Sequence, residues 1–63
     1  MQVTVQHLGG APEQRHLDDT DTIQDLEDFE NEYNYLINGL ESTANSPLRN
    51  GDHVTVVPQP KGA

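Results

Sequence analysis

The sequence predicts an α+β fold in which a mixed sheet of four to five strands packs on one helix. Residues 1–8 and 53–57 alternate apolar and polar side chains and are rich in valine, which is typical of half-buried strands. Between them, residues 22–31 place apolar side chains at helical spacing. Because the chain has only 63 residues, one helix covering one face of the sheet is the arrangement that gives it a core.

The first 17 residues predict a hairpin. Apolar and polar residues alternate over residues 1–8, and Gly9-Gly10 follows as a turn that can use positive φ. Residues 13–17 are a weaker strand, predicted mainly because the first strand needs a hairpin partner.

The helix is predicted over residues 22–31. Thr22 is suited to the N-cap, and Asp25 stands three residues later in the spacing of a capping box. Acidic residues in the first turns also suit the helix dipole. The expected apolar stripe consists of Ile23, Leu26, Phe29 and, at its end, Tyr33.

The last third of the chain predicts the rest of the sheet. A strand over residues 33–37 leads into Asn38-Gly39, the strongest hairpin dipeptide in the chain, and residues 40–42 return as a short strand. After a polar loop, we expect Leu48 to plug the core from below. The first strand and the last, residues 53–57, are then expected side by side in the centre of the sheet.

Two prolines in the last six residues stop further strand pairing. We therefore expect one domain over residues 1–57 and a flexible C-terminal tail over residues 58–63.

The charge is strongly acidic, with 11 acids against 3 bases and a formal net charge of −8. This balance disfavours nucleic acid, which requires Lys and Arg. Eight acids fall between Asp18 and Glu32. They indicate either a surface for a basic partner or a halophilic surface, and composition does not separate the two.

Apolar runs fall short of the roughly 20 residues of a membrane helix, and no signal peptide is visible. We therefore expect a cytoplasmic protein that does not bind membranes and is a monomer alone. The chain has no cysteine, so it has no disulfide.

The segments 22–26, 35–39 and 47–57 resemble the ubiquitin-like sulfur carriers of thiamine and molybdopterin biosynthesis (the ThiS/MoaD family) and their archaeal modifier relatives. The most specific part is the pattern P-L-x-x-G-D-x-V-x-V-V, which begins at Pro47. It also occurs in TGS domains, which are regulatory modules. The resemblance implies a β-grasp fold over nearly the whole chain.

The resemblance also implies a function that resides in the C-terminal carboxylate. In this family an adenylating enzyme activates a terminal Gly-Gly with ATP and magnesium, and sulfur transfer gives a thiocarboxylate or leads to a conjugate. Gly62 and Ala63 occupy the two corresponding positions. The implied partners are the adenylating enzyme and a sulfur acceptor or synthase subunit, while this chain binds no cofactor and is not itself an enzyme.

Ala63 departs from the family pattern, because it adds a methyl group beside the reacting carboxylate. Three alternatives remain open: the partner enzyme tolerates Ala63, Ala63 is trimmed, or the activity has been lost.

The surface expected to meet the partner comprises Tyr35, Ile37, Val57 and Pro58. Strand alternation places Leu36 on the face opposite Tyr35 and Ile37, so one of these sets faces away from the helix. Packing near a sheet edge and an exposed patch are equally compatible with this pattern. The alternative function is a non-catalytic ubiquitin-like or TGS-like interaction module with an inert tail.

The sequence predicts no active site of its own. Ser42, Thr43 and Ser46 lie in turn-like sequence without a nucleophile elbow. The three histidines, His7, His16 and His53, are read as surface residues rather than zinc ligands, so no metal site is expected.

Overall fold

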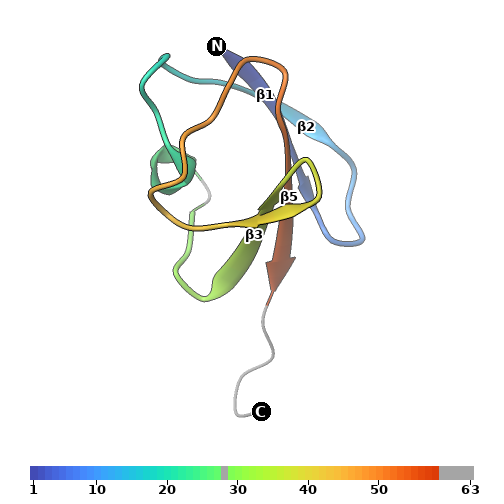
Figure 1. Ribbon diagram of the computed structural model, residues 1–63. Helices are drawn as coiled ribbons and strands as arrows, with labels where there is room; N and C mark the ends of the chain where they lie inside the picture. The colour runs from blue at the N-terminus through green and yellow to red at the C-terminus, as the bar shows by residue number, and fades with distance from the viewer. Residues whose placement is uncertain (28, 59–63) are drawn as a thin grey trace.

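Five strands form one mixed sheet in the order β2-β1-β5-β3-β4 in the computed structural model, which describes residues 1–27 and 29–58 (Figure 1). The strands are β1 (Gln2–His7), β2 (Glu13–His16), β3 (Tyr33–Ile37), β4 (Leu40–Ser42) and β5 (His53–Pro58). β1 and β5 are parallel, and the other neighbouring pairs are antiparallel. The predicted strands are thus confirmed, and so is the pairing of the first strand with the last.

The β3–β4 hairpin has the turn that its sequence predicts. Asn38 and Gly39 both have positive φ, 52° and 86°, as the central residues of a type I′ turn require. The Asn38 side chain fastens this turn to the start of β5, because its Oδ1 accepts a hydrogen bond from the His53 N–H at 3.0 Å.

The core lies on one face of the sheet, between the central strands and the segments that cross over them. Alternate residues of β1, β5 and β3 point into it, as the period of a strand requires. Its buried members are Val3, Val5, Ile23, Leu26, Tyr35, Leu48, Val54 and Val56. Leu48, at 4% exposed, is the expected plug under the core.

The predicted helix over residues 22–31 is not found in the part of the chain that the structure describes. A single 3-10 turn, η1 (Ile23–Asp25), occupies its start. The capping prediction is confirmed, since Asp25 Oδ2 accepts a hydrogen bond from the Thr22 N–H at 2.8 Å. The turn then ends at Leu26, whose φ of −64° and ψ of 138° are extended.

The charge of this segment explains why the helix does not continue. Glu27 and Glu30 would be neighbours on a helix surface, where like charges are destabilising. The sequence has no Lys or Arg between Arg15 and Arg49 to offset them. A helix of this length is also marginal without strong propensity, which Asp and Asn do not provide.

The apolar positions expected for the helix still reach the core. Ile23 is fully buried and Leu26 is 6% exposed, while Phe29 and Tyr33 are half-buried against them. The backbone N–H of Ile23 bonds to the carbonyl of Ser46 at 3.2 Å. This segment, residues 17–32 without residue 28, is called the acidic crossover below.

The end of the sheet lies one residue beyond the predicted domain boundary, because β5 includes Pro58. The predicted tail over residues 59–63 lies outside the described residues. None of the helices in the described ranges is long and apolar enough to cross a membrane.

Candidate functional site

The chain leaves the sheet from a central strand. β5 lies between β1 and β3, and its last residue, Pro58, is paired with Tyr33, the first residue of β3 (Figure 1). Pro58 is exposed, while Val57 before it is half-buried. Gly62 and Ala63 are the fourth and fifth residues after Pro58 and lie outside the described residues. Five residues span at most about 18 Å when fully extended.

The four residues expected to contact a partner lie on two faces of the sheet. Tyr35 is paired with Val56, and Ile37 with Val54, so both belong to the core face. Val57 points to the opposite face. Only Val57 and Pro58 are therefore brought together beside the end of β5.

Tyr35 is a core residue in this structure and is 5% exposed. Its ring stacks on Phe29, with ring centroids 5.4 Å apart and an interplanar angle of 22°. Its hydroxyl oxygen accepts a hydrogen bond from the Glu30 N–H at 2.8 Å. The ring thus ties the acidic crossover to β3, and it offers almost no surface to a partner.

The outer face of the sheet carries an apolar patch, and Leu8 is the member of it that was not expected from the sequence. It consists of Leu8, Leu36 and Val57, and we call it the outer patch. The Leu8 N–H bonds to the Val56 carbonyl at 2.9 Å, which continues the β1–β5 ladder and sets Leu8 beside Val57. Leu8 is 67% exposed. Its signal in the sequence is an apolar residue at an even position of the first strand, where residues 2, 4 and 6 are polar.

The surroundings of the outer patch are polar but mostly uncharged. Asn34 is paired with Val57, and Leu36 with Thr55. The outer face of the three central strands carries Gln2, Thr4, Gln6, Asn34, Leu36, His53, Thr55 and Val57. A carboxylate borders the patch on β4, where Glu41 is paired with Leu36, so a partner that covers Leu36 has to leave Glu41 in water or pair it with a cation.

An acidic groove opens beside the end of β5. It has a volume of about 410 Å³ and is lined by His7, Glu27, Phe29, Glu30 and Tyr33. The His7 and Tyr33 rings meet edge to face, with centroids 6.5 Å apart. Because Tyr33 is paired with Pro58, a partner that receives the C-terminal segment meets negative charge at this point.

The carboxylate of Glu30 sets the electrostatics of this groove. It raises the pKa of Tyr33 above the usual 10.0, first by hydrogen bonding with the hydroxyl and second by its negative charge. The cause is that ionised Tyr33 would lose this hydrogen bond and face a like charge.

The hydroxyl groups near β4 have structural partners. Ser42 Oγ donates to the Tyr35 carbonyl at 2.7 Å, and Ser46 Oγ accepts from the Thr43 N–H at 2.9 Å. Within the described ranges, no three His, Cys, Asp or Glu side chains are grouped as a metal site would require.

Comparison with known proteins identifies the fold. No protein-family model and no curated protein sequence matches the chain. Among solved structures, SAMP1 from Haloferax volcanii superposes with a TM-score of 0.76 over 100% of both chains, at 15% sequence identity. SAMP1 is a small archaeal modifier protein with a ubiquitin-like fold. The likeness shows that this chain has the ubiquitin-like β-grasp fold that its sequence predicts.

Proposed function

We propose that the protein is a ubiquitin-like sulfur carrier or protein modifier. Its C-terminal carboxylate would be adenylated by a partner enzyme and converted to a thiocarboxylate or a conjugate. The observation that carries the proposal is the likeness in fold to SAMP1 over the full length of both chains. The position of Pro58 supports it, because the described chain ends at the last residue of a central strand, five residues before the carboxylate that would react.

The proposed chemistry takes place on the last residue. The carboxylate attacks the α-phosphorus of ATP, releases pyrophosphate and forms an acyl adenylate. A sulfur donor or an amine then displaces AMP, which leaves a thiocarboxylate or an amide. ATP and magnesium belong to the partner in this scheme. Gly62 suits a narrow channel, because it has no side chain to clash, and Ala63 adds one methyl group there.

The partner enzyme would hold the protein by the outer patch and the acidic groove. Val57 and Pro58 connect these surfaces to the C-terminal segment. Tyr35 and Ile37 face the core side of the sheet, and in the proposed complex they support β3 rather than contact the enzyme. An enzyme surface with apolar side chains over Leu36 and cationic side chains near Glu30 would complement both regions.

The direct test is reaction with the cognate adenylating enzyme, Mg-ATP and a sulfur donor, followed by intact mass measurement. Wild type, Ala63→Gly and a variant without Ala63 are compared. A wild-type product that retains Ala63 means that the enzyme tolerates it, whereas a product that lacks Ala63 means that trimming precedes activation. Reaction by the variants alone, or by none of the three proteins, would contradict the proposal for this chain.

The outer patch favours a second candidate function, a non-catalytic interaction module with an inert tail. Leu8, which is 67% exposed, adjoins Val57 on this face, and exposed apolar side chains that are grouped rather than single are typical of interaction surfaces. In this case truncation after Pro58 leaves partner binding unchanged, while Leu36→Ser abolishes it. In the carrier both changes abolish activation.

A further inference from the structure

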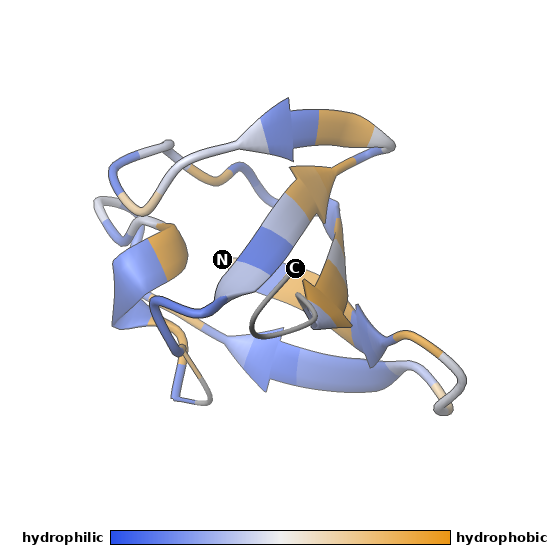
Figure 2. Ribbon diagram, turned by 90° about the horizontal axis from the view of Figure 1, so that it is seen from below, coloured by the Kyte–Doolittle hydropathy of each residue, from blue (hydrophilic) through white to orange (hydrophobic). Residues whose placement is uncertain are grey.

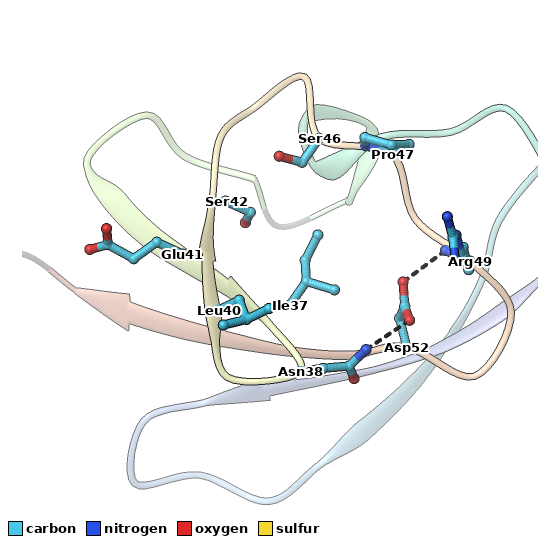
Figure 3. A pocket seen from close by; sticks show the side chains of 9 residues that line it. All are labelled: Ile37, Asn38, Leu40, Glu41, Ser42, Ser46, Pro47, Arg49 and Asp52. Atoms are coloured by element: carbon cyan, nitrogen blue, oxygen red, sulfur yellow. Dashed lines mark hydrogen bonds between the residues drawn. The ribbon is translucent and has the colours of Figure 1, made fainter.

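A groove lies under β4, at the end of β3 that is far from Pro58. It has a volume of about 330 Å³. Its walls include Ile37, Leu40 and Ser42 from the hairpin, and Pro47 and Arg49 from the loop that precedes β5 (Figure 3). We call it the β4 groove. It shares no residue with the outer patch or with the acidic groove.

The β4 edge has backbone groups available for another strand. β4 is the last strand in the sheet order, so one of its sides has no neighbour. In the β3–β4 register, Ile37 pairs with Leu40 across a two-residue turn, and Tyr35 pairs with Ser42. Since antiparallel ladders alternate, Glu41 directs its N–H and C=O away from β3. Neither group has a partner among the residues that the structure describes.

The two edges of the sheet differ in how they are protected. β2 carries Glu13 and Arg15, which form an ion pair with an N–O distance of 2.6 Å, and charges of this kind discourage strand addition. β4 carries Leu40, which is 73% exposed. In Figure 2 the edge strand β2 is hydrophilic along its length, whereas β3 ends and β4 begins with hydrophobic residues on either side of their turn, before β4 continues with a hydrophilic residue. The β4 edge is thus open in its backbone, and it carries an exposed apolar side chain, Leu40, beside the single carboxylate of Glu41.

Charge distinguishes the two ends of the β4 groove. Arg49 lines one end. Among residues 1–27 and 29–58 its backbone N–H has a hydrogen-bond partner, Asp52, whereas its guanidinium has none. Asp52 also lines the groove, and its carboxylate oxygens accept hydrogen bonds from the Arg49 backbone N–H at 2.8 Å and the Asn38 side chain at 3.0 Å rather than from the guanidinium. Glu41 points outward at the opposite end (Figure 3).

We propose that the β4 edge binds an extended peptide segment of a partner protein as an added strand. The backbone of the peptide pairs with Glu41, and a large apolar side chain packs on Leu40 and Ile37. A carboxylate of the peptide meets the guanidinium of Arg49. This mode combines main-chain hydrogen bonds for affinity with side-chain contacts for specificity.

The net charge selects a partner peptide over a second copy of this chain. Each copy has a formal net charge of −8, so pairing two β4 edges brings two strongly acidic molecules together. A partner segment needs only one carboxylate, placed at Arg49. The β4 groove is at the end of β3 where Ile37 pairs with Val54, whereas Pro58 pairs with Tyr33 at the other end. Because the two sites are separated by the length of β3, the peptide can bind while the C-terminal segment is bound to another partner.

The probe is an acetylated and amidated hexapeptide of sequence lysine-threonine-valine-leucine-valine-aspartate. Backbone amide NMR shifts of the full-length protein are followed during titration. We expect saturable shifts confined to β4, its turn and Arg49. Replacing the aspartate of the peptide by asparagine, or Arg49→Gln in the protein, is expected to weaken binding by about tenfold, the loss typical of one charge-assisted hydrogen bond.

Matched variants distinguish strand addition at the β4 edge from nonspecific binding of the peptide to exposed apolar side chains. Leu40→Thr is expected to weaken binding, whereas Leu8→Thr, which changes the exposed leucine of the outer patch, leaves it unchanged. Glu41→Pro removes the outward N–H and is expected to abolish binding, whereas Glu41→Gln retains it. If Glu41→Pro fails to fold, a peptide N-methylated at its central residues tests the same hydrogen bonds from the other side.

Shifts centred on the outer patch, equal effects of Leu40→Thr and Leu8→Thr, or no saturable shift with the hexapeptide would overturn the proposal. Sedimentation of the protein alone provides the remaining outcome. A dimer that is lost in Glu41→Pro would show that a second copy occupies the β4 edge, and the proposed occupant would be wrong.

Discussion

The central strands and the acidic crossover are held in place by different forces. β1, β5 and β3 are joined by continuous ladders and carry four buried valines: Val3, Val5, Val54 and Val56. The crossover has one 3-10 turn and enters the core through Ile23 and Leu26. Its backbone meets the rest of the chain mainly in the loop before β5, where Gln24 N–H bonds to the Ala44 carbonyl at 2.9 Å.

The difference shows what a short acidic segment can do in a small domain. Its carboxylates repel one another and face water, so hydrogen bonding along a helix does not stabilise it. The crossover is stabilised instead by the burial of two apolar side chains, Ile23 and Leu26. The crossover is therefore expected to depend on few side chains and on ionic strength, whereas the sheet depends on many contacts shared among its strands.

The largest effect is expected at the anchor of the crossover. Ile23→Ala should lower the free energy of unfolding by about 3 kcal/mol, because it removes a fully buried side chain and leaves a cavity. A domain of this length has a total stability of roughly 3–9 kcal/mol, so much of the protein would unfold. Urea unfolding followed by circular dichroism measures the loss.

Two controls sharpen this prediction. Ile37→Ala, a matched change at a half-buried isoleucine of β3, should cost clearly less. Val54→Ala, in the centre of the sheet, should cost about 2 kcal/mol, since it removes less buried surface. A cost for Ile23→Ala no greater than that for Ile37→Ala would mean that the crossover does not depend on its anchor.

A smaller effect is expected at the 3-10 turn. Asp25→Ala removes the carboxylate that accepts hydrogen bonds from the backbone N–H and the hydroxyl of Thr22. The cost should be about 1 kcal/mol, as for other capping residues. Glu27→Ala removes an exposed carboxylate of the same segment that caps nothing, and should leave the urea midpoint unchanged or raise it. Equal losses in both variants would argue against the capping role.

Salt is expected to stabilise the protein modestly through the crossover. Raising NaCl from 0.05 to 1 M shortens the screening length to about 3 Å and weakens the repulsion among the carboxylates. The urea midpoint should rise, and it should rise less in a Glu27→Gln, Glu30→Gln double variant than in wild type. A salt response that is identical in the two proteins would assign the effect to charges elsewhere.

The smallest expected effect is the pH dependence of stability that arises from Tyr33, the first residue of β3, where the crossover ends. Its folded pKa is raised above 10.0 by Glu30, so the protonated phenol is favoured in the folded state. This contribution to stability is complete below pH 10 and is lost as the pH rises through the raised pKa. Tyrosinate absorbance in a Tyr35→Phe background should show a midpoint above 10.0 that falls in Glu30→Gln. An unchanged midpoint in Glu30→Gln would remove Glu30 as the cause.

The sheet could be predicted from sequence because its signals are local and agree with one another. The valine alternation of β1 and β5 reports the same buried face as their observed pairing. Asn38-Gly39 specifies the hairpin turn, since both residues accept positive φ. These features are set by nearest neighbours along the chain and do not depend on the rest of the molecule.

The helix could not be predicted correctly because the spacing of apolar residues does not record the cost of charge. Ile23 and Leu26 are buried as a helix would bury them, but Leu26 is already extended. The backbone conformation of this segment is determined by charge repulsion and by hydrogen bonds to carbonyl groups of the neighbouring loop. The hydrogen bonds to the loop are a tertiary effect, which the local sequence does not report. The prediction for this segment is therefore confirmed for the burial of Ile23 and Leu26 and wrong for the secondary structure.

The candidate site was predicted only in part for a similar reason. Val57 lies in the last strand, as expected, whereas Pro58, which was predicted to begin the tail, is the last residue of β5. Tyr35 is in the core because its hydroxyl and ring bind Glu30 and Phe29, contacts that only the folded crossover creates. Leu8 lay within the predicted first strand, but it was missed because it shares its face with Gln2, Thr4 and Gln6, the polar side of the alternation.

The central claim is that the C-terminal carboxylate is the group that reacts. The most direct test is to locate the modified group after reaction with the adenylating enzyme, Mg-ATP and a sulfur donor. Tandem mass spectrometry of the C-terminal peptide distinguishes a change at the terminal carboxyl from a change at any side chain. The account predicts exchange of one carboxylate oxygen for sulfur at the terminal residue, with the side chains of residues 1–58 unaltered. A modification on a side chain, or an unmodified C-terminal carboxyl, would contradict it.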